Sequence, residues 1–131
     1  MAIDLDIQWI WLDDVKVCLS ARTRGTLTVE DFEKMLQSFS EAFLAIDAPA
    51  ILDLRQARWD LGAADIVAIV SGLTQAGLGV NNKIALLCAR DIDHYGQLMV
   101  MASAASNRGI KARAFYDFDG ALKWLANDWN D

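Results

Sequence analysis

The sequence contains few of the residues on which catalytic and targeting motifs depend. Its 131 residues include one histidine, one proline and two cysteines, and the net charge is −6 at pH 7. Nucleic acids and anionic lipid surfaces attract proteins with a positive field, so we expect neither as a partner. Cys18 and Cys88 lie within apolar segments far apart in the chain. They are predicted to be buried, reduced thiols, which favours a cytoplasmic location.

Long uninterrupted apolar segments are also missing. The first residues, MAIDLDIQWIW, carry no basic region and are interrupted by Asp4 and Asp6, so we expect no secretory signal. The longest apolar helical pattern contains Ser71 and Gly72 and is too broken to cross a bilayer. No stretch rich in Gly, Ser or Pro marks a linker, and residues 1–131 are predicted to form a single domain.

The sequence does contain a repeated strand–loop–helix rhythm. The clearest unit runs from Ala48 to Leu73, and similar units follow it, which is typical of a parallel sheet covered by helices. Two alternating segments around Asp13-Asp14 predict an antiparallel hairpin before these units. The predicted strands are Ile7–Leu12, Val15–Arg22, Ala50–Leu54, Lys83–Ala89 and Lys111–Phe118. The sequence thus predicts an α/β fold with a mixed five-stranded sheet and four helices, in which the strands after the N-terminal antiparallel hairpin are parallel.

Local signals place the helix ends. Thr28 is predicted to cap a helix whose apolar stripe runs from Phe32 to Ile46, and Asp91 to cap a helix that stops at Asn107-Arg108-Gly109. The other two helices are expected around Ile66–Leu73 and from Asp119 to Trp129. Trp9 and Trp11 share one face of the first strand, where we expect them to pack into the core or cover the edge of the sheet.

Four ordered segments resemble those of the SpoIIAA-like proteins, a bacterial group allied to STAS domains and also compared with CRAL-TRIO lipid carriers. They are GTLTVEDF at 25–32, ILDLR at 51–55, WDL at 59–61, and AFYDF at 114–118 followed by Ala121, Trp124 and Leu125. The resemblance implies an α/β sandwich with a mixed sheet. It also implies a binding or regulatory role and no established reaction.

The chain departs from this family at the phosphorylation site. STAS regulators that antagonise anti-sigma factors carry a phosphorylatable serine at the start of the helix after the Asp-Leu strand. Here Leu61 or Gly62 occupies that place, and a phosphate beside Asp60 and Asp65 would meet like charge. Partner switching by phosphorylation is therefore not expected.

The candidate binding residues follow two predicted central strands. In an open α/β sheet the carboxyl ends of parallel strands bind ligands. Two arginines beside an indole suit an anionic group or a partner's carboxylate, and tryptophan is a frequent hot-spot residue. The alternative is a solvated loop whose tryptophan covers the core. The predicted binding residues are Arg55, Arg58, Trp59 and Asp60 after the first central strand, and Arg90, Asp91, His94 and Tyr95 after the next.

Patterns for known reactions are incomplete. His94 is the one histidine, either a ligand contact or an exposed residue at a helix start, and no serine completes a Ser-His-Asp triad with it. The loop after Cys88 lacks the glycines that surround phosphate in phosphatases. Asp53 lies inside a predicted strand without the acidic pair of a receiver domain. Gly72, Gly77 and Gly79 follow a helix rather than a strand, so they do not form a dinucleotide loop. We expect no metal and no cofactor.

Three hypotheses follow. The leading one is a non-enzymatic binding or regulatory module of the SpoIIAA-like type that contacts a protein partner. The second is a carrier of a small apolar or acyl ligand, suggested by Phe32, Met35, Phe39 and Phe43 and by the CRAL-TRIO comparison. The third is a small enzyme using His94. A homodimer is compatible with each.

Overall fold

The computed structural model describes residues 5–11, 17–44, 48–59, 61–75, 77 and 83–126. The strands are β1 (Leu5–Trp11), β2 (Val17–Leu27), β3 (Ala50–Trp59), β4 (Lys83–Leu87) and β5 (Lys111–Phe115). The helices are α1 (Val29–Leu44), α2 (Ala63–Gln75), α3 (Ile92–Ser106) and α4 (Phe118–Ala126). Some predicted features lie outside the described residues: the turn at Asp13-Asp14, Ile46, Asp60, Gly79 and Trp129.

The five strands form one sheet in the order β1-β2-β3-β4-β5. β1 pairs with β2 antiparallel, and each later pair of neighbouring strands is parallel. This confirms the predicted mixed α/β fold. β4, an interior strand of the sheet, is buried along its whole length. Four of its five residues, Ile84–Leu87, are apolar, as expected for a strand covered on both faces. Six large apolar residues of β3 and β4 are buried, as expected for interior strands: Ile51, Leu52, Leu54, Ile84, Leu86 and Leu87.

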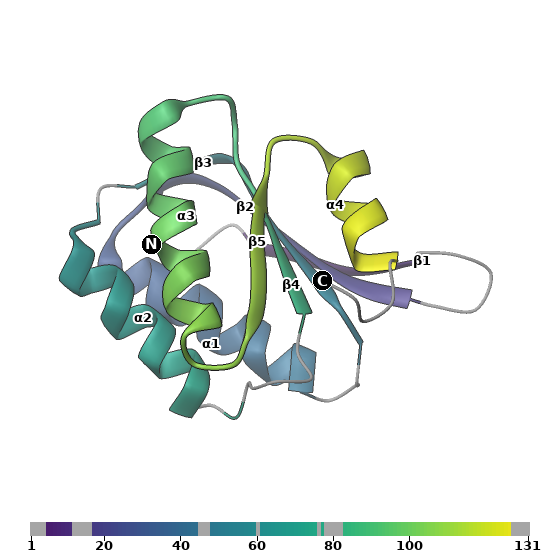
Figure 1. Cartoon of the computed structure of the whole chain (residues 1–131), viewed down its shortest axis with the longest axis horizontal. Helices are drawn as coiled ribbons and strands as arrows, with labels where there is room; N and C mark the ends of the chain where they lie inside the picture. Colours follow the sequence, from purple (N-terminus) through teal and green to yellow (C-terminus); the bar gives the residue numbers. More distant parts are fainter. Residues whose placement is uncertain are drawn as a thin grey trace.

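The helices divide unequally between the two faces of the sheet (Figure 1). α1, α2 and α3 each connect one parallel strand to its neighbour, and all three steps run in the same direction across the sheet. Because such crossovers share one hand, the three helices lie on one face, over the larger core cluster. α4 follows the last strand and packs on the opposite face through Ala121, Trp124 and Leu125.

The predicted caps of α1 and α3 are present. The Thr28 hydroxyl accepts from the Asp31 backbone N–H (3.1 Å), and the Asp31 carboxylate accepts from the Thr28 N–H (3.0 Å). This reciprocal pair satisfies two donors at the start of α1. At the end of α3, Gly109 adopts φ 85° and the next N–H, of Ile110, bonds to the Ala105 carbonyl. Glycine tolerates this left-handed conformation, so it ends the helix where the sequence predicted.

The ends of β2 and β3 differ from the prediction. Both strands continue past the end of β4 and pair with each other as far as Leu27 and Trp59. Arg22 pairs with Asp53 but Arg24 pairs with Gln56, so Leu54 and Arg55 form a β-bulge opposite the single residue Thr23. The expected loop after Leu54 is therefore a strand. The prediction failed because this pairing joins segments distant in sequence, which local periodicity does not register.

The two tryptophans of β1 are not core residues. On the face of the sheet that α1, α2 and α3 cover, Trp9 lies opposite Leu19 and Trp11 opposite Val17. Their side chains are nevertheless 43% and 68% exposed. Of the two expected roles, packing into the core is wrong, because the strand lies at the edge of the sheet, beyond the cover that the helices give to its neighbours. Their place on the edge strand agrees with the other role, cover for the edge of the sheet.

Candidate functional site

The carboxyl ends of β3, β4 and β5 lie at the same edge of the sheet, as predicted. We call the residues gathered there the carboxyl-end surface: Arg58, Trp59, Arg90, Asp91, His94, Tyr95 and Tyr116. Within it the rings of Trp59 and His94 lie 4.5 Å apart, centroid to centroid, at an interplanar angle of 36°. This contact joins the end of β3 to the first turn of α3. Two segments proposed from sequence as one site are therefore in contact.

Trp59 is a core residue at this surface. Its side chain is 5% exposed, and its ring meets Phe32 of α1 edge-on with centroids 5.8 Å apart. The bulge in β3 explains the burial, because the added residue shifts the alternation of the strand. Leu52 and Leu54 face the helices before the bulge, and Ala57 and Trp59 face them after it. The proposal of an exposed indole is therefore wrong, and the alternative, an indole that covers the core, is correct.

Asp91 and His94 form a polar pair in the first turn of α3. One carboxylate oxygen of Asp91 accepts from the backbone N–H groups of Asp93 (3.0 Å) and His94 (3.3 Å), which caps the helix as predicted. The other oxygen lies 3.4 Å from Nδ1 of His94. The histidine side chain is 21% exposed. His94 is thus neither fully solvated nor buried, and its ring lies between an indole and a carboxylate.

Arg90, Tyr95 and Tyr116 form a stack of side chains from two loops and a helix. The rings of Tyr95 and Tyr116 lie parallel within 21°, with centroids 4.3 Å apart. The guanidinium carbon of Arg90 lies 5.0 Å from the centroid of the Tyr116 ring. Such a cation–π contact favours the planar guanidinium of arginine. We call these three residues the arginine–tyrosine stack.

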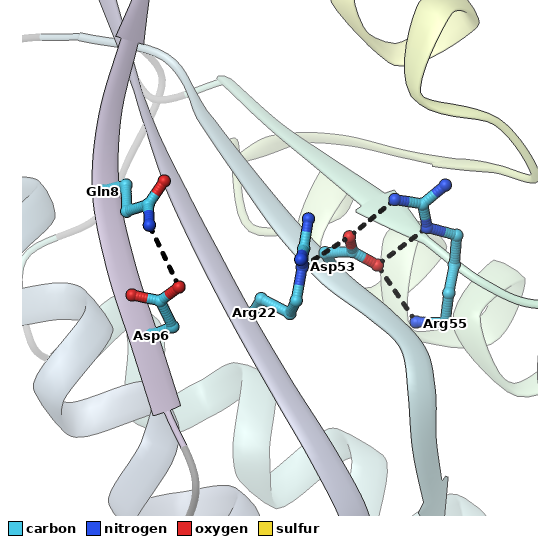
Figure 2. A network of polar contacts seen from close by, with 5 residues as sticks. All are labelled: Asp6, Gln8, Arg22, Asp53 and Arg55. Carbon is cyan, nitrogen blue, oxygen red and sulfur yellow. Dashed lines mark hydrogen bonds and ion pairs between the residues drawn. The ribbon is translucent and has the colours of Figure 1, made fainter.

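Arg55 lies apart from the carboxyl-end surface. Its guanidinium makes two bonds to the Asp53 carboxylate, from Nε (3.0 Å) and Nη2 (2.8 Å), and its backbone N–H makes a third (3.1 Å). Arg22 of β2 approaches the same carboxylate from the other side, with Nε at 3.4 Å (Figure 2). This cluster lies on the α4 side of the sheet, where Arg55 also lies 5.9 Å from the Phe118 ring centroid. Arg55 is therefore the main hydrogen-bonding partner of the Asp53 carboxylate.

Asp53 lies inside a strand, β3, as predicted, and the environment in which it is buried keeps it ionised. Burial alone would raise the pKa of the carboxyl. The hydrogen bonds from Arg55 and the charges of Arg55 and Arg22 outweigh it and lower the pKa below its ordinary value. A carboxylate so fully bonded differs from an open phosphoacceptor.

The other predicted residues take different positions. Arg58 is exposed on β3, opposite Thr26 of β2, and points away from the face that Trp59 occupies. Asp60 lies outside the described residues. Where the resemblance to STAS regulators places a phosphoacceptor, Leu61 is buried, and the Gly62 N–H donates to the Asp65 carboxylate at 3.0 Å at the start of α2. Neither residue has a hydroxyl.

The thiols and the possible metal ligands give no sign of chemistry. Burial raises the pKa of Cys18 to about 12 and, together with the charge of Asp91, that of Cys88 to about 11. Both thiols are therefore protonated at neutral pH. Among the described residues, no group of three His, Cys, Asp or Glu side chains could hold a metal ion. The described helices also include none that is long and apolar enough to cross a bilayer.

Sequence reasoning missed Tyr116 as a site residue. Tyr116 directly follows β5, and Arg90 follows β4 with two residues between them. A position after the carboxyl end of a parallel strand made Arg90 a candidate, and Tyr116 has such a position too. The acids in these loops have structural roles instead. Asp91 caps α3, and the Asp117 carboxylate accepts from the Gly120 N–H (2.6 Å) at the start of α4. An aspartate just before a helix predicts a cap, and this prediction was made for Asp91 but not for Asp117.

No protein-family model and no curated protein matches the sequence. Among solved structures, the chain is similar to an uncharacterized protein from the DUF3478 family with a SpoIIAA-like fold, from Shewanella loihica PV-4. The TM-score is 0.61 at 23% sequence identity, and the match covers 96% of this chain and 97% of the other. The likeness extends over the whole sheet and the helices on both of its faces. The chain therefore has a SpoIIAA-like fold.

Proposed function

We propose that the protein is a non-enzymatic binding or regulatory module of the SpoIIAA-like type, acting in the cytoplasm through the exposed part of its carboxyl-end surface. The arginine–tyrosine stack carries this proposal. Arg90 is exposed and Tyr95 and Tyr116 are partly exposed. Arginine and tyrosine are enriched among residues that dominate the affinity of protein interfaces. Stacking holds the three side chains in place before binding, which lowers the entropy lost on association.

The neighbouring charges favour a protein partner that presents a carboxylate beside an apolar or aromatic group. Asp91 and Asp117 use their carboxylates as helix caps, and Asp91 also contacts His94. Arg90 and Arg58, both exposed, contribute positive charge at this edge of a chain whose net charge is −6. Arginine binds carboxylates through paired hydrogen bonds, so it supplies both attraction and orientation.

Regulation by phosphorylation at the start of α2 is not part of the proposal. Leu61 is buried and Gly62 has no side chain. The nearby Asp65 carboxylate already accepts a hydrogen bond from the Gly62 N–H, which is one of the donors that would bind a phosphate at a helix start. Partner choice would therefore depend on the carboxyl-end surface itself.

The test is a binding measurement with a matched control. The protein is used as bait in a lysate of its host, the captured partner is identified and purified, and its dissociation constant is measured by calorimetry. Arg90→Ala and Tyr116→Ala should each weaken binding at least about tenfold. Arg113→Ala is the control, because this exposed arginine also lies over an aromatic ring, Phe115 at 5.6 Å, but outside the carboxyl-end surface. Equal affinity of all the variants would refute the proposal.

A carrier of a small apolar or acyl ligand is the second candidate, and one observation favours it. A groove of about 240 Å³ lies between α1 and α2, and an apolar gap of about 20 Å³ lies beneath it in the core. Leu36 and Leu73 line both spaces, so displacement of these two side chains would join them. Native mass spectrometry of protein purified from its host tests this candidate. A bound lipid supports it, and a bare chain mass contradicts it.

A further inference from the structure

Among the residues that the structure describes, β1 forms the less protected of the two edges of the sheet. β1 and β5 are the two edge strands. Proteins commonly protect such strands with charged side chains, lysine above all, or with proline, because an open edge can pair with another strand. β5 carries two charged side chains, Lys111 and Arg113, in its five residues. β1 has seven residues, LDIQWIW, of which Asp6 alone is charged and none is proline.

Apolar surface accompanies this open edge. Trp9 and Trp11 are 43% and 68% exposed, and Ile7 and Ile10 are only partly buried. The inner edge of β1 is already paired with β2 from Leu5 to Trp11. Figure 2 shows β1 beside β2, with Asp6 and Gln8 on the same face of the sheet as Arg22 and Asp53. An additional strand would therefore have to approach the outer edge.

We propose that β1 is the interface between two copies of this chain, which pair antiparallel through their β1 strands about a two-fold axis at Gln8. The sequence of the strand is complementary to itself in this register. All seven residues find a partner, with Gln8 opposite Gln8 of the second copy. Ile7 lies opposite Trp9, which gives an aromatic–aliphatic pair twice, and Asp6 lies opposite Ile10, so no like charges face each other.

The two-fold arrangement also preserves the faces of the sheet. Ile7, Trp9 and Trp11 share the face that α1, α2 and α3 cover. A two-fold axis perpendicular to the sheet keeps them on that face in both copies. The exposed tryptophans of one copy then cover apolar residues of the other. The two sheets would combine into one continuous ten-stranded sheet whose outer edges are the two protected β5 strands.

Sedimentation equilibrium of the full chain at about 1 to 100 µM tests the interface. We expect a dimer for the natural protein. In the Trp9→Lys/Trp11→Lys double variant the dissociation constant should rise at least about tenfold, because each lysine would face an apolar residue. Met99→Lys is the matched control, since Met99 is 49% exposed on α3 and far from β1 in sequence. Circular dichroism verifies that each variant is folded. A monomeric natural protein, or a dimer that survives the double variant, would overturn the proposal.

Disulfide crosslinking tests the register independently of the tryptophans. In the proposed pairing, Gln8→Cys places two cysteines directly opposite each other, at a Cα separation of roughly 4.5–5.5 Å that a disulfide spans. Asp6→Cys, the control, places its two cysteines about 13 Å apart along the strands. Cys18 and Cys88 are buried and do not compete. A covalent dimer should form with Gln8→Cys alone. Equal crosslinking of both variants, or of neither, would contradict the two-fold axis at Gln8.

Discussion

The imidazole of His94 lies on the indole of Trp59, so a partly exposed ring of α3 rests on a buried ring of β3. The buried ring in turn meets Phe32 of α1. Three elements that are distant in sequence therefore support one half-exposed side chain. A substitution in the core beneath this contact should alter the carboxyl-end surface without touching an exposed residue.

The burial of Trp59 predicts a large loss of stability on truncation. Trp59→Ala should lower the free energy of unfolding by about 3–5 kcal/mol, because it removes a large core side chain and leaves a cavity. Trp59→Phe should cost less, since a smaller cavity remains. Urea denaturation followed by circular dichroism measures both variants. A Trp59→Ala protein within about 1 kcal/mol of the natural chain would contradict the burial.

Asp53 should make stability depend on pH in the acid range. Its pKa is lower in the folded chain than in the unfolded chain, so the ionised carboxylate stabilises the fold. This contribution is complete at pH values above the unfolded pKa of about 3.9 and is lost as the pH falls through the folded pKa.

Asp53→Asn should therefore lower the free energy of unfolding by about 1.5–3 kcal/mol at pH 7, the range for hydrogen bonds to charged groups. The difference from the natural protein should shrink as the pH falls below about 4. Thermal unfolding from pH 7 to pH 2 measures it. Asp6→Asn, on the exposed surface of β1, is the control and should change stability little. A difference that is independent of pH would contradict the ionised Asp53.

The thiols should be unreactive in the folded protein. Cys18 and Cys88 are buried, and burial raises their pKa values to about 12 and about 11. Since the thiolate is the nucleophile, a disulfide reagent at pH 8 should modify them only as fast as the protein opens. The absorbance of the released thiolate measures the rate. Guanidinium should release two rapid equivalents, and rapid modification without denaturant would contradict the prediction.

Incubation with an anti-sigma-type kinase should leave the mass of the chain unchanged. Leu61 and Gly62 stand where the STAS regulators that this sequence resembles carry their acceptor serine, and neither has a hydroxyl. Gly62→Ser is an informative companion, because among the described residues the added Cβ would meet the Asp65 carboxylate alone, at an ordinary contact distance of 3.6 Å. The variant should fold like the natural protein. A phosphopeptide between Arg58 and Leu73 of the natural chain would show that an acceptor exists there.

The fold could be predicted where local signals and burial agree. The β4 segment is apolar after Lys83 and is covered on both faces, and the Thr28 cap lies where α1 begins. The added length of β3 could not be predicted. Its last residues are ordered by pairing with β2 from Arg24 to Leu27, a segment that contains Gly25 and resembles a turn. Gly25 adopts φ 91° within the strand, which glycine alone tolerates easily.

The candidate site was predicted in outline but not in detail. The adjacency of β3 and β4 brings Trp59 to His94, as expected for neighbouring parallel strands. The exposure expected for Trp59 and the loop position expected for Arg55 were wrong, because both assumed that the chain leaves the sheet after Leu54. A residue in a strand alternates between faces, so its exposure depends on a register that the sequence does not display.

The bulge in β3 makes the order of side chains beyond it depend on the number of backbone residues rather than on their identity. Inserting one residue between Gln56 and Ala57, with the bulge kept, would place Arg58 opposite Leu27 of β2 and turn the end of the strand over. The guanidinium of Arg58 would then face the apolar interior, and the indole of Trp59 would face water. A chain one residue longer would keep nearly the same composition and lose both its closed core and the outward charge at this edge.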